Sequence, residues 1–196
     1  MKHPSNRELF DYWNERRGER LAPERADIEP GAIRKVLGDT FVLDVGGNGS
    51  HLFRIAGTRL CALFGRELKG ESFVRLWQRS GQTAIRELIA VVAEEKAGVI
   101  ASVTGATSDA TLLPVHLELL LLPLSHPSRG EARVMGALAP IAAPYWLGAK
   151  AIGPLTLGMF RHIGAAVDAA APPRFSAAAG RIRHGLIVYD GGRAAD

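Results

Sequence analysis

The sequence predicts an α+β fold, in which a five-stranded antiparallel sheet carries its helices on one face. Two strand-like runs come early in the chain, a helical stretch follows them, and three further strand-like runs come after it. This order is typical of an antiparallel sheet with its helices gathered on one side. The chain has 196 residues, of which 47% are hydrophobic and 22% charged, so it has the size and composition of one globular domain with extensions.

The first segment is predicted to be a helix over residues 5–17. Ser5 and Glu8 have the spacing of a capping box, and Leu9, Tyr12 and Trp13 fall on one side of such a helix. A connecting arm that contains several prolines then leads to the first strand.

The next segment is predicted to be a β-hairpin. Residues 40–45 and 51–56 are rich in strand-forming side chains, and the glycines of Gly46–Gly49 supply the turn between them. Asp44 and Arg54 lie on neighbouring strands of this hairpin, so we expect them to pair across it.

Helices are expected between this hairpin and the later strands. A short helix begins near Thr58 and ends at Gly65, and further short helices continue to about Trp77. The longest predicted helix covers residues 82–96, where apolar side chains recur at intervals of three and four.

Three strands are predicted over residues 99–104, 111–122 and 132–141. The second of them is apolar on both of its faces, so both faces of the sheet should be at least partly covered. One face carries Leu113, Val115, Leu117, Leu119 and Leu121, and the other carries Leu112, His116, Glu118, Leu120 and Leu122.

The chain divides into three predicted parts. Residues 1–38 form the N-terminal helix and arm, residues 39–143 form the domain, and residues 144–196 form an extension that we expect to be partly disordered. Residues 169–173 resemble a linker, whereas Leu186–Tyr189 is apolar enough that we expect it to dock on the sheet or on a partner.

Composition excludes several classes of protein. Cys61 is the only cysteine, so neither an intramolecular disulfide nor a multi-cysteine metal cluster is possible. No apolar run is long enough to span a membrane or to form a secretory signal, so we expect a cytoplasmic protein. Positive and negative residues are interspersed up to residue 143, which argues against a nucleic-acid-binding face.

The order of elements is that of a PAS domain, and local motifs strengthen the likeness. Gly57–Gly70 resembles the first helices of that fold. Arg25–Pro30, Phe53–Thr58, Leu121–Leu124 and Asp190–Arg193 are similar to segments of a family of stand-alone bacterial PAS proteins. The resemblance implies a sensory or signal-transduction domain that binds a small ligand, a partner protein or both, and that forms homodimers.

The resemblance also implies where binding would occur. The sheet would curve around a cavity closed by the helices, and the N-terminal helix would supply the dimer interface through Leu9, Tyr12 and Trp13. The candidate pocket residues are Phe53, Ile55, Leu60, Phe64, Phe73, Trp77, Ile85, Leu88, His116 and Glu118. Each apolar member of this set is equally suited to a packed core.

The ligand remains unknown at this stage, and two cofactors are disfavoured. Cys61 lacks the Asn-Cys-Arg setting in which photoactive PAS domains form a flavin adduct, and residues 82–96 contain no histidine for haem. His116 and Glu118 would fill only part of a metal's coordination, so they are better explained as a polar pair or as part of a pocket.

Three functional hypotheses follow. The first is a PAS sensor that binds a small molecule, relays its signal to a downstream protein and has no catalytic activity. The second is an adaptor with a packed core that binds only other proteins. The third is a small-molecule enzyme of the α+β cavity type that uses His116 and Glu118, although the sequence contains no nucleophile elbow, P-loop or dinucleotide motif.

Overall fold

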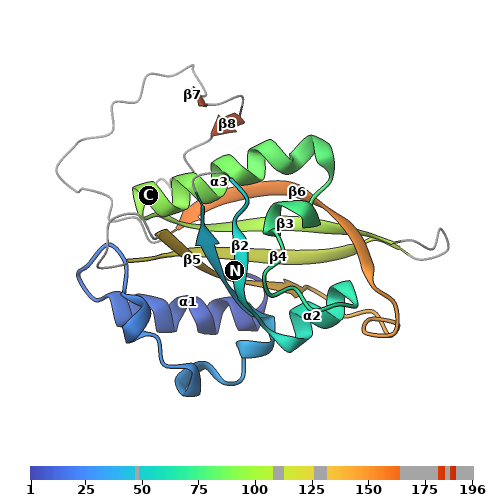
Figure 1. Cartoon of the computed structure of the whole chain (residues 1–196), viewed down its shortest axis with the longest axis horizontal. Helices are drawn as coiled ribbons and strands as arrows, with labels where there is room; N and C mark the ends of the chain where they lie inside the picture. Colours follow the sequence, from blue (N-terminus) through green and yellow to red (C-terminus); the bar gives the residue numbers. More distant parts are fainter. Residues whose placement is uncertain (47–48, 108–112, 126–131, 164–180, 184–185, 189–196) are drawn as a thin grey trace, which may run out of the picture. The chain divides into compact units, whose positions relative to one another are not determined.

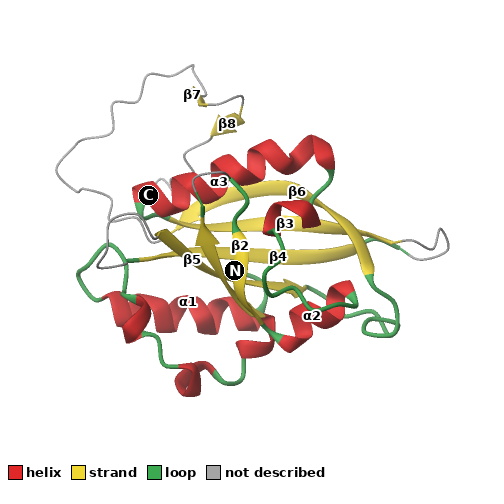
Figure 2. Ribbon diagram, in the orientation of Figure 1, coloured by secondary structure: helices red, strands yellow, loops and turns green. Residues whose placement is uncertain are grey.

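The fold is seen in a computed structural model that describes residues 1–46, 49–107, 113–125, 132–163, 181–183 and 186–188. The chain divides into two compact units, Met1–Ala165 and Ala166–Asp196. Within the part of the chain that the structure describes, the α-helices and the large sheet belong to the first unit (Figures 1 and 2). No helix among the described residues is long and apolar enough to cross a membrane.

The large sheet is antiparallel and has six strands in the order β2-β1-β5-β4-β3-β6. The strands are β1 (Thr40–Val45), β2 (Leu52–Ala56), β3 (Gly98–Thr107), β4 (Val115–Leu124), β5 (Ala132–Pro140) and β6 (Ile152–Ile163). The predicted α+β class, the antiparallel pairing and the first five strands are confirmed. The count of five is corrected by β6, which the sequence analysis left inside the C-terminal extension.

β6 escaped prediction because its apolar residues are not spaced two apart. Ile152, Leu155, Leu157 and Phe160 pair with successive alternate residues of β3, although two of the gaps between them are three residues long. Two irregularities in the β3–β6 register absorb the extra residues, so all four positions fall on the same face of the sheet. The pattern resembles helical spacing, yet it belongs to a strand with two bulges.

The helices are α1 (Pro4–Arg17), α2 (Thr58–Phe64) and α3 (Gln82–Glu95). Shorter 3₁₀ turns are η1 (Arg25–Asp27), η2 (Pro30–Ile33), η3 (Leu37–Asp39), η4 (Phe73–Leu76) and η5 (Arg79–Gly81). α2 ends at Gly65, which has a φ of 64° and so adopts the left-handed conformation that glycine tolerates best. The three predicted helices are therefore confirmed within one residue at each end.

The start of α1 differs from the predicted capping box. His3 is the cap, and its Nδ1 accepts a hydrogen bond from the backbone N–H of Ser5 at 3.1 Å. The helix thus begins at Pro4, a residue suited to the first helical turn because it has no N–H to satisfy. The Ser5 hydroxyl is free to donate elsewhere, and it reaches Asp39.

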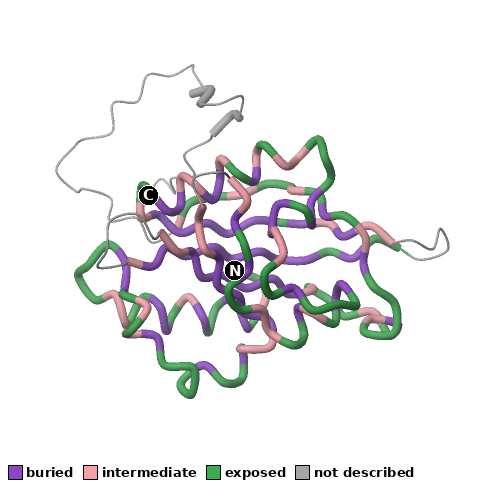
Figure 3. The backbone as a smooth tube through the Cα atoms, in the orientation of Figure 1, coloured by how far each residue is buried: buried purple, intermediate pink, exposed green. Residues whose placement is uncertain are grey.

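The helices α2 and α3 lie on one face of the sheet, as predicted, and the additional N-terminal helix α1 covers the other face. The face that we call the α3 face packs against α2, η4 and α3, whereas the face that we call the α1 face packs against α1 and the arm. Most residues of the central strands β4 and β5 are buried (Figure 3). On β4, Leu117, Leu119 and Leu121 belong to the first layer and Leu120 and Leu122 to the second, as alternation predicts.

The second unit contains two short antiparallel strands, β7 (Arg181–Arg183) and β8 (Leu186–Val188). The predicted linker at residues 169–173 lies outside the described residues. The docking predicted for Leu186–Tyr189 likewise concerns side chains outside them, so it stays a prediction.

Candidate functional site

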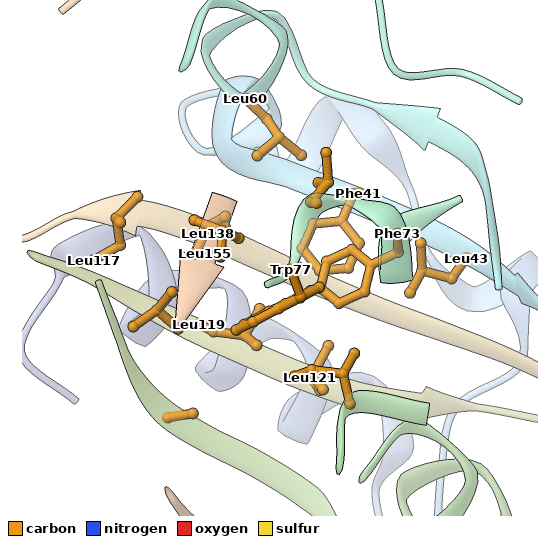
Figure 4. Packing of buried hydrophobic residues seen from close by; sticks show 14 of the residues in the cluster. Phe41, Leu43, Leu60, Phe73, Trp77, Leu117, Leu119, Leu121, Leu138 and Leu155 are labelled. Atoms are coloured by element: carbon orange, nitrogen blue, oxygen red, sulfur yellow. The ribbon is translucent and has the colours of Figure 1, made fainter. Parts of the chain in front are cut away.

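Seven of the ten candidate pocket residues meet in one apolar layer on the α3 face. They are Phe53 from β2, Leu60 and Phe64 from α2, Phe73 from η4, Trp77 directly after η4, and Ile85 and Leu88 from α3. None is more than 5% exposed. β4 and β5 form the floor beneath them, with Leu117, Leu119, Leu121 and Leu138 pointing into the layer (Figure 4).

Aromatic rings form the centre of this layer. Phe41, Phe53 and Phe73 lie with ring centroids 5.3 to 5.7 Å apart, and Trp77 extends the group at 5.7 Å from Phe73. The Phe53 ring meets the other two phenylalanines edge to face. Such geometry is favourable for aromatic pairs, so the group is a well-formed apolar surface.

Trp77 is the polar exception within this layer. Its side chain is buried, and the indole Nε1 has no hydrogen-bond partner. On the α1 face, by contrast, the indole of Trp13 donates to the carbonyl oxygen of Pro123 at 2.9 Å. Buried N–H groups are rarely left without an acceptor, so Trp77 requires an explanation.

The structure does not bring the other three candidates into this layer. Ile55 is 44% exposed, because a bulge in the β1–β2 register pairs Phe53 with Leu43 but Ile55 with Val42 on the opposite face. His116 is exposed, and it lies with Glu118 on the α1 face because both are even-numbered positions of β4. The sequence showed this alternation but not which face the helices α2 and α3 would cover.

Glu118 has a structural environment. Its carboxylate accepts hydrogen bonds from the backbone N–H of Lys2 at 2.7 Å, from that of His3 at 2.8 Å and from Nδ2 of Asn6 at 3.2 Å. The side chain is only 6% exposed. It therefore holds the beginning of α1 on the sheet, and these contacts occupy the carboxylate that an enzymatic role with His116 would need.

A second polar contact at the start of α1 was missed by the sequence analysis. The buried Asp39 accepts from the Ser5 hydroxyl at 2.7 Å and from Nε and Nη2 of Arg59, also at 2.7 Å each. The Asp39 hydrogen bond holds the pKa of Arg59 above its usual value. Because Arg59 belongs to α2, Asp39 links the covers of the two faces. Arg59 is 20 residues from Asp39, so no local spacing announces the pair.

Leu9, Tyr12 and Trp13, the predicted dimer contacts, are buried within the single chain. They pack against the sheet in the layer that contains Leu120 and Leu122. A dimer formed through these three side chains would therefore require α1 to leave its own sheet or to be exchanged between two copies.

The ion pair predicted between Asp44 and Arg54 is present, with 3.5 Å between the two groups. Arg133 of β5 contacts the same Asp44 carboxylate at 3.2 Å.

His51 is an unexpected feature beside the α3 face. It is 3% exposed, both of its ring nitrogens lack partners, and its φ of 43° is unusual for a residue with a side chain. Burial, followed by the positive charge of Arg86, lowers the pKa of this imidazole below its ordinary value. A neutral ring is therefore favoured in the fold.

Cys61 is half-buried against the same layer. Its thiol contacts Oε1 of Glu67 at 3.5 Å, and burial raises the thiol's pKa, so the unreactive protonated form is favoured. α3, like the helix predicted over residues 82–96, contains no histidine that could bind a haem iron. Among the described residues, no group of three His, Cys, Asp or Glu side chains is placed to hold a metal ion.

Residues 1–139 of the chain match the family model that is described as a PAS domain. The chain therefore belongs to the PAS domain family, which confirms the resemblance, and it is accordingly a sensory or signalling module. The match includes α1 and the arm and ends within β5, so β6 lies beyond it.

Comparison with individual proteins adds little. No curated protein matches the chain. The chain is similar to a solved structure of an RNA-binding light-oxygen-voltage receptor, with 17% sequence identity and a TM-score of 0.42. The match covers 57% of this chain and 33% of the receptor, so the chain spans about a third of that protein's length. The expectation that this chain binds no nucleic acid stays a prediction.

Proposed function

We propose that this PAS domain is a sensor that binds a small molecule in the apolar layer on its α3 face. Binding is relayed to a downstream protein, and the domain itself catalyses no reaction. The site consists of the seven buried residues that meet there, whereas Ile55, His116 and Glu118 are not part of it. The protein acts in the cytoplasm as a homodimer.

The observation that carries this proposal is the way in which the layer is covered. One wall is a continuous sheet, but part of the other consists of short pieces, namely the seven residues of α2 and the 3₁₀ turn η4. Short turns contain few internal hydrogen bonds, so they open at a lower free energy than the central strands do. The backbone hydrogen bonds that join this segment to the sheet reach only the edges, at His51 and Phe53 beside β2 and at Leu155 of β6. A ligand can therefore enter by displacing the cover while the four central strands stay paired.

The two alternative functions, adaptor and enzyme, would depend on different parts of the domain. A pure adaptor needs the layer only as a packed core, so it would bind no small molecule there. An enzyme using His116 and Glu118 would need that carboxylate to be available, and it is already bonded to the start of α1. The sensor proposal thus accounts for the family membership without requiring Glu118 to exchange partners.

Extraction of bound compounds tests the proposal. Full-length protein, purified without denaturation, is unfolded in organic solvent, and the extract is analysed by mass spectrometry and absorbance. We expect one compound in stoichiometric amount from the parent protein and from Ile55→Ala, whose change lies outside the layer. Phe73→Leu should retain less of it. An extract without any compound, together with no thermal stabilisation by a metabolite library, would favour the packed-core adaptor.

The proposed dimer is tested separately by light scattering at micromolar concentration. If α1 is exchanged between copies, Trp13→Ala should weaken both the dimer and the fold. A monomeric full-length protein at that concentration would remove the dimer from the proposal without affecting ligand binding.

A further inference from the structure

We infer that the ligand of the α3 face is a neutral, largely apolar molecule with a hydrogen-bond acceptor that receives the indole N–H of Trp77. This inference rests on the proposed function and specifies the class of molecule that the sensor would take. A ketone, ester, ether or alcohol oxygen carried on a hydrocarbon frame has this chemistry.

The unpartnered N–H supplies the first part of the argument. Trp77 is 2% exposed, and its Nε1 is a donor with no acceptor in the structure. A buried donor without a partner loses its hydration and gains nothing in return, so a ligand oxygen placed there restores a full hydrogen bond. Trp13 demonstrates the ordinary outcome, since its N–H is bonded to Pro123.

The backbone of Trp77 is held at β6 and at α3, and its ring packs against Phe73 of η4. The backbone of Trp77 forms a bridge with Leu155 of β6, and the next N–H, that of Gln78, donates to the Leu155 carbonyl at 2.9 Å. Nε2 of Gln82, at the start of α3, donates to the Trp77 carbonyl at 3.2 Å. The ring also packs against Phe73 (Figure 4). These contacts tie the Trp77 end of the cover to β6 and α3, so the indole can keep its place on the sheet when α2 and η4 are displaced. A donor that keeps its place loses little freedom on binding.

The surrounding layer sets the charge of the ligand. Among the described residues, the buried carboxylates Asp39 and Glu118 already have hydrogen-bond partners at the start of α1. His51, the one histidine that is buried among the described residues, favours its neutral form. The layer around Trp77 is composed of apolar side chains, so a charged ligand would lose its hydration without meeting a counter-charge.

Three probes of similar size test the inference on the full-length protein, namely acetophenone, isopropylbenzene and benzoate. We expect acetophenone to bind about tenfold more tightly than isopropylbenzene, since only the ketone accepts a hydrogen bond, and benzoate to bind weakest. Trp77→Phe should bring acetophenone down to the affinity of isopropylbenzene or below it, because the buried ketone oxygen then has no donor. Trp13→Phe, which alters the other face, should preserve the difference.

An NMR measurement on the parent protein gives a reading that does not depend on the variants folding. The indole N–H signal of Trp77 should move downfield with acetophenone and less with isopropylbenzene. Equal affinities and equal shifts for these two probes would overturn the assigned ligand class while leaving a hydrophobic sensor in place. Tightest binding of benzoate would overturn it as well. If no probe binds and no compound co-purifies, the proposed function fails together with this inference.

Discussion

The two faces of the sheet carry covers that are attached by different chemistry. On the α1 face, α1 is held by directional hydrogen bonds to Glu118, to Asp39 and from Trp13 to Pro123. On the α3 face, α2 is bonded through Arg59 to Asp39, and the segment around η4 is bonded through its backbone to Phe53 and Leu155 at the sheet edges. The contacts between α2, η4 and α3 themselves are mainly apolar and aromatic, and Trp77 lacks an acceptor. Directional bonds specify one position, whereas apolar contacts tolerate rearrangement at small cost. The difference indicates that α1 is fixed in place on its face, whereas the pieces of the α3-face cover are tied at their ends and can rearrange where they pack on one another.

The largest expected effect comes from removing the anchor of the fixed cover. Trp13→Ala should destabilise the protein by about 3–5 kcal/mol, because a fully buried indole and its hydrogen bond are lost together. Chemical denaturation followed by circular dichroism measures the change. A loss under about 1 kcal/mol would mean that α1 contributes little to the fold, and the contrast between the faces would disappear.

The next effect concerns the carboxylate that links the two covers. Asp39→Ala should cost roughly 2–3 kcal/mol, since it leaves the Ser5 hydroxyl without its acceptor and removes both hydrogen bonds from Arg59. The matched control is Glu71→Ala, which removes a solvent-accessible carboxylate paired with the exposed Arg66 and should cost under about 1 kcal/mol. Equal losses in the two variants would show that burial of Asp39 adds nothing to the link.

Much of this arrangement could be predicted from local patterns, and the failures have definite physical causes. Alternation on β4 correctly separated Leu119 from Leu120. It could not show that Ile55 leaves the face of Phe53, because a bulge shifts the register by one residue. Bulges also concealed β6, because they absorb the three-residue spacing between some of its apolar residues and so keep those residues on one face. Irregular pairing depends on both strands, so neither strand's own sequence reveals it.

The polar links were beyond prediction for a different reason. Asp39 and Arg59 approach each other because the chain passes very close to itself at Gly57, where a Cβ atom would overlap the carbonyl oxygens of Leu37 and Gly38. The position of Glu118 beneath α1 depends in the same way on where a distant helix docks. Such contacts follow from the assembled topology, whereas periodicity reports only which face of a strand or helix is apolar.

A matched pair of substitutions sharpens the comparison between the faces. Trp13→Phe should cost about 1–2 kcal/mol more than Trp77→Phe in ligand-free protein. The first change leaves the Pro123 carbonyl without its donor, whereas the second removes an N–H that had no acceptor. Both changes replace an indole with the same smaller ring, so the loss of volume largely cancels. If Trp77→Phe proved the more destabilising of the two, the Trp77 N–H would have a partner in solution.

The smallest expected effect is a pH dependence that originates beside the α3 face. The pKa of His51 is lowered in the fold from 6.5, so above that pH both folded and unfolded states hold a neutral ring. As the pH falls below 6.5, the unfolded chain takes up a proton that the folded protein resists, and the free energy of unfolding decreases until the folded pKa is reached. The slope cannot exceed about 1.4 kcal/mol per pH unit for one proton.

Denaturation curves between pH 7.5 and about 5 measure this slope, since the imidazole changes charge in that range. His51→Asn should flatten it, and asparagine tolerates the positive φ at this position. His116→Asn is the control, because it makes the same substitution at an exposed histidine. An identical slope in the parent and in His51→Asn would mean that the His51 ring is hydrated or hydrogen-bonded in solution. The α3 face would then be less dry than its apolar lining indicates, and the argument for a neutral ligand would lose its support.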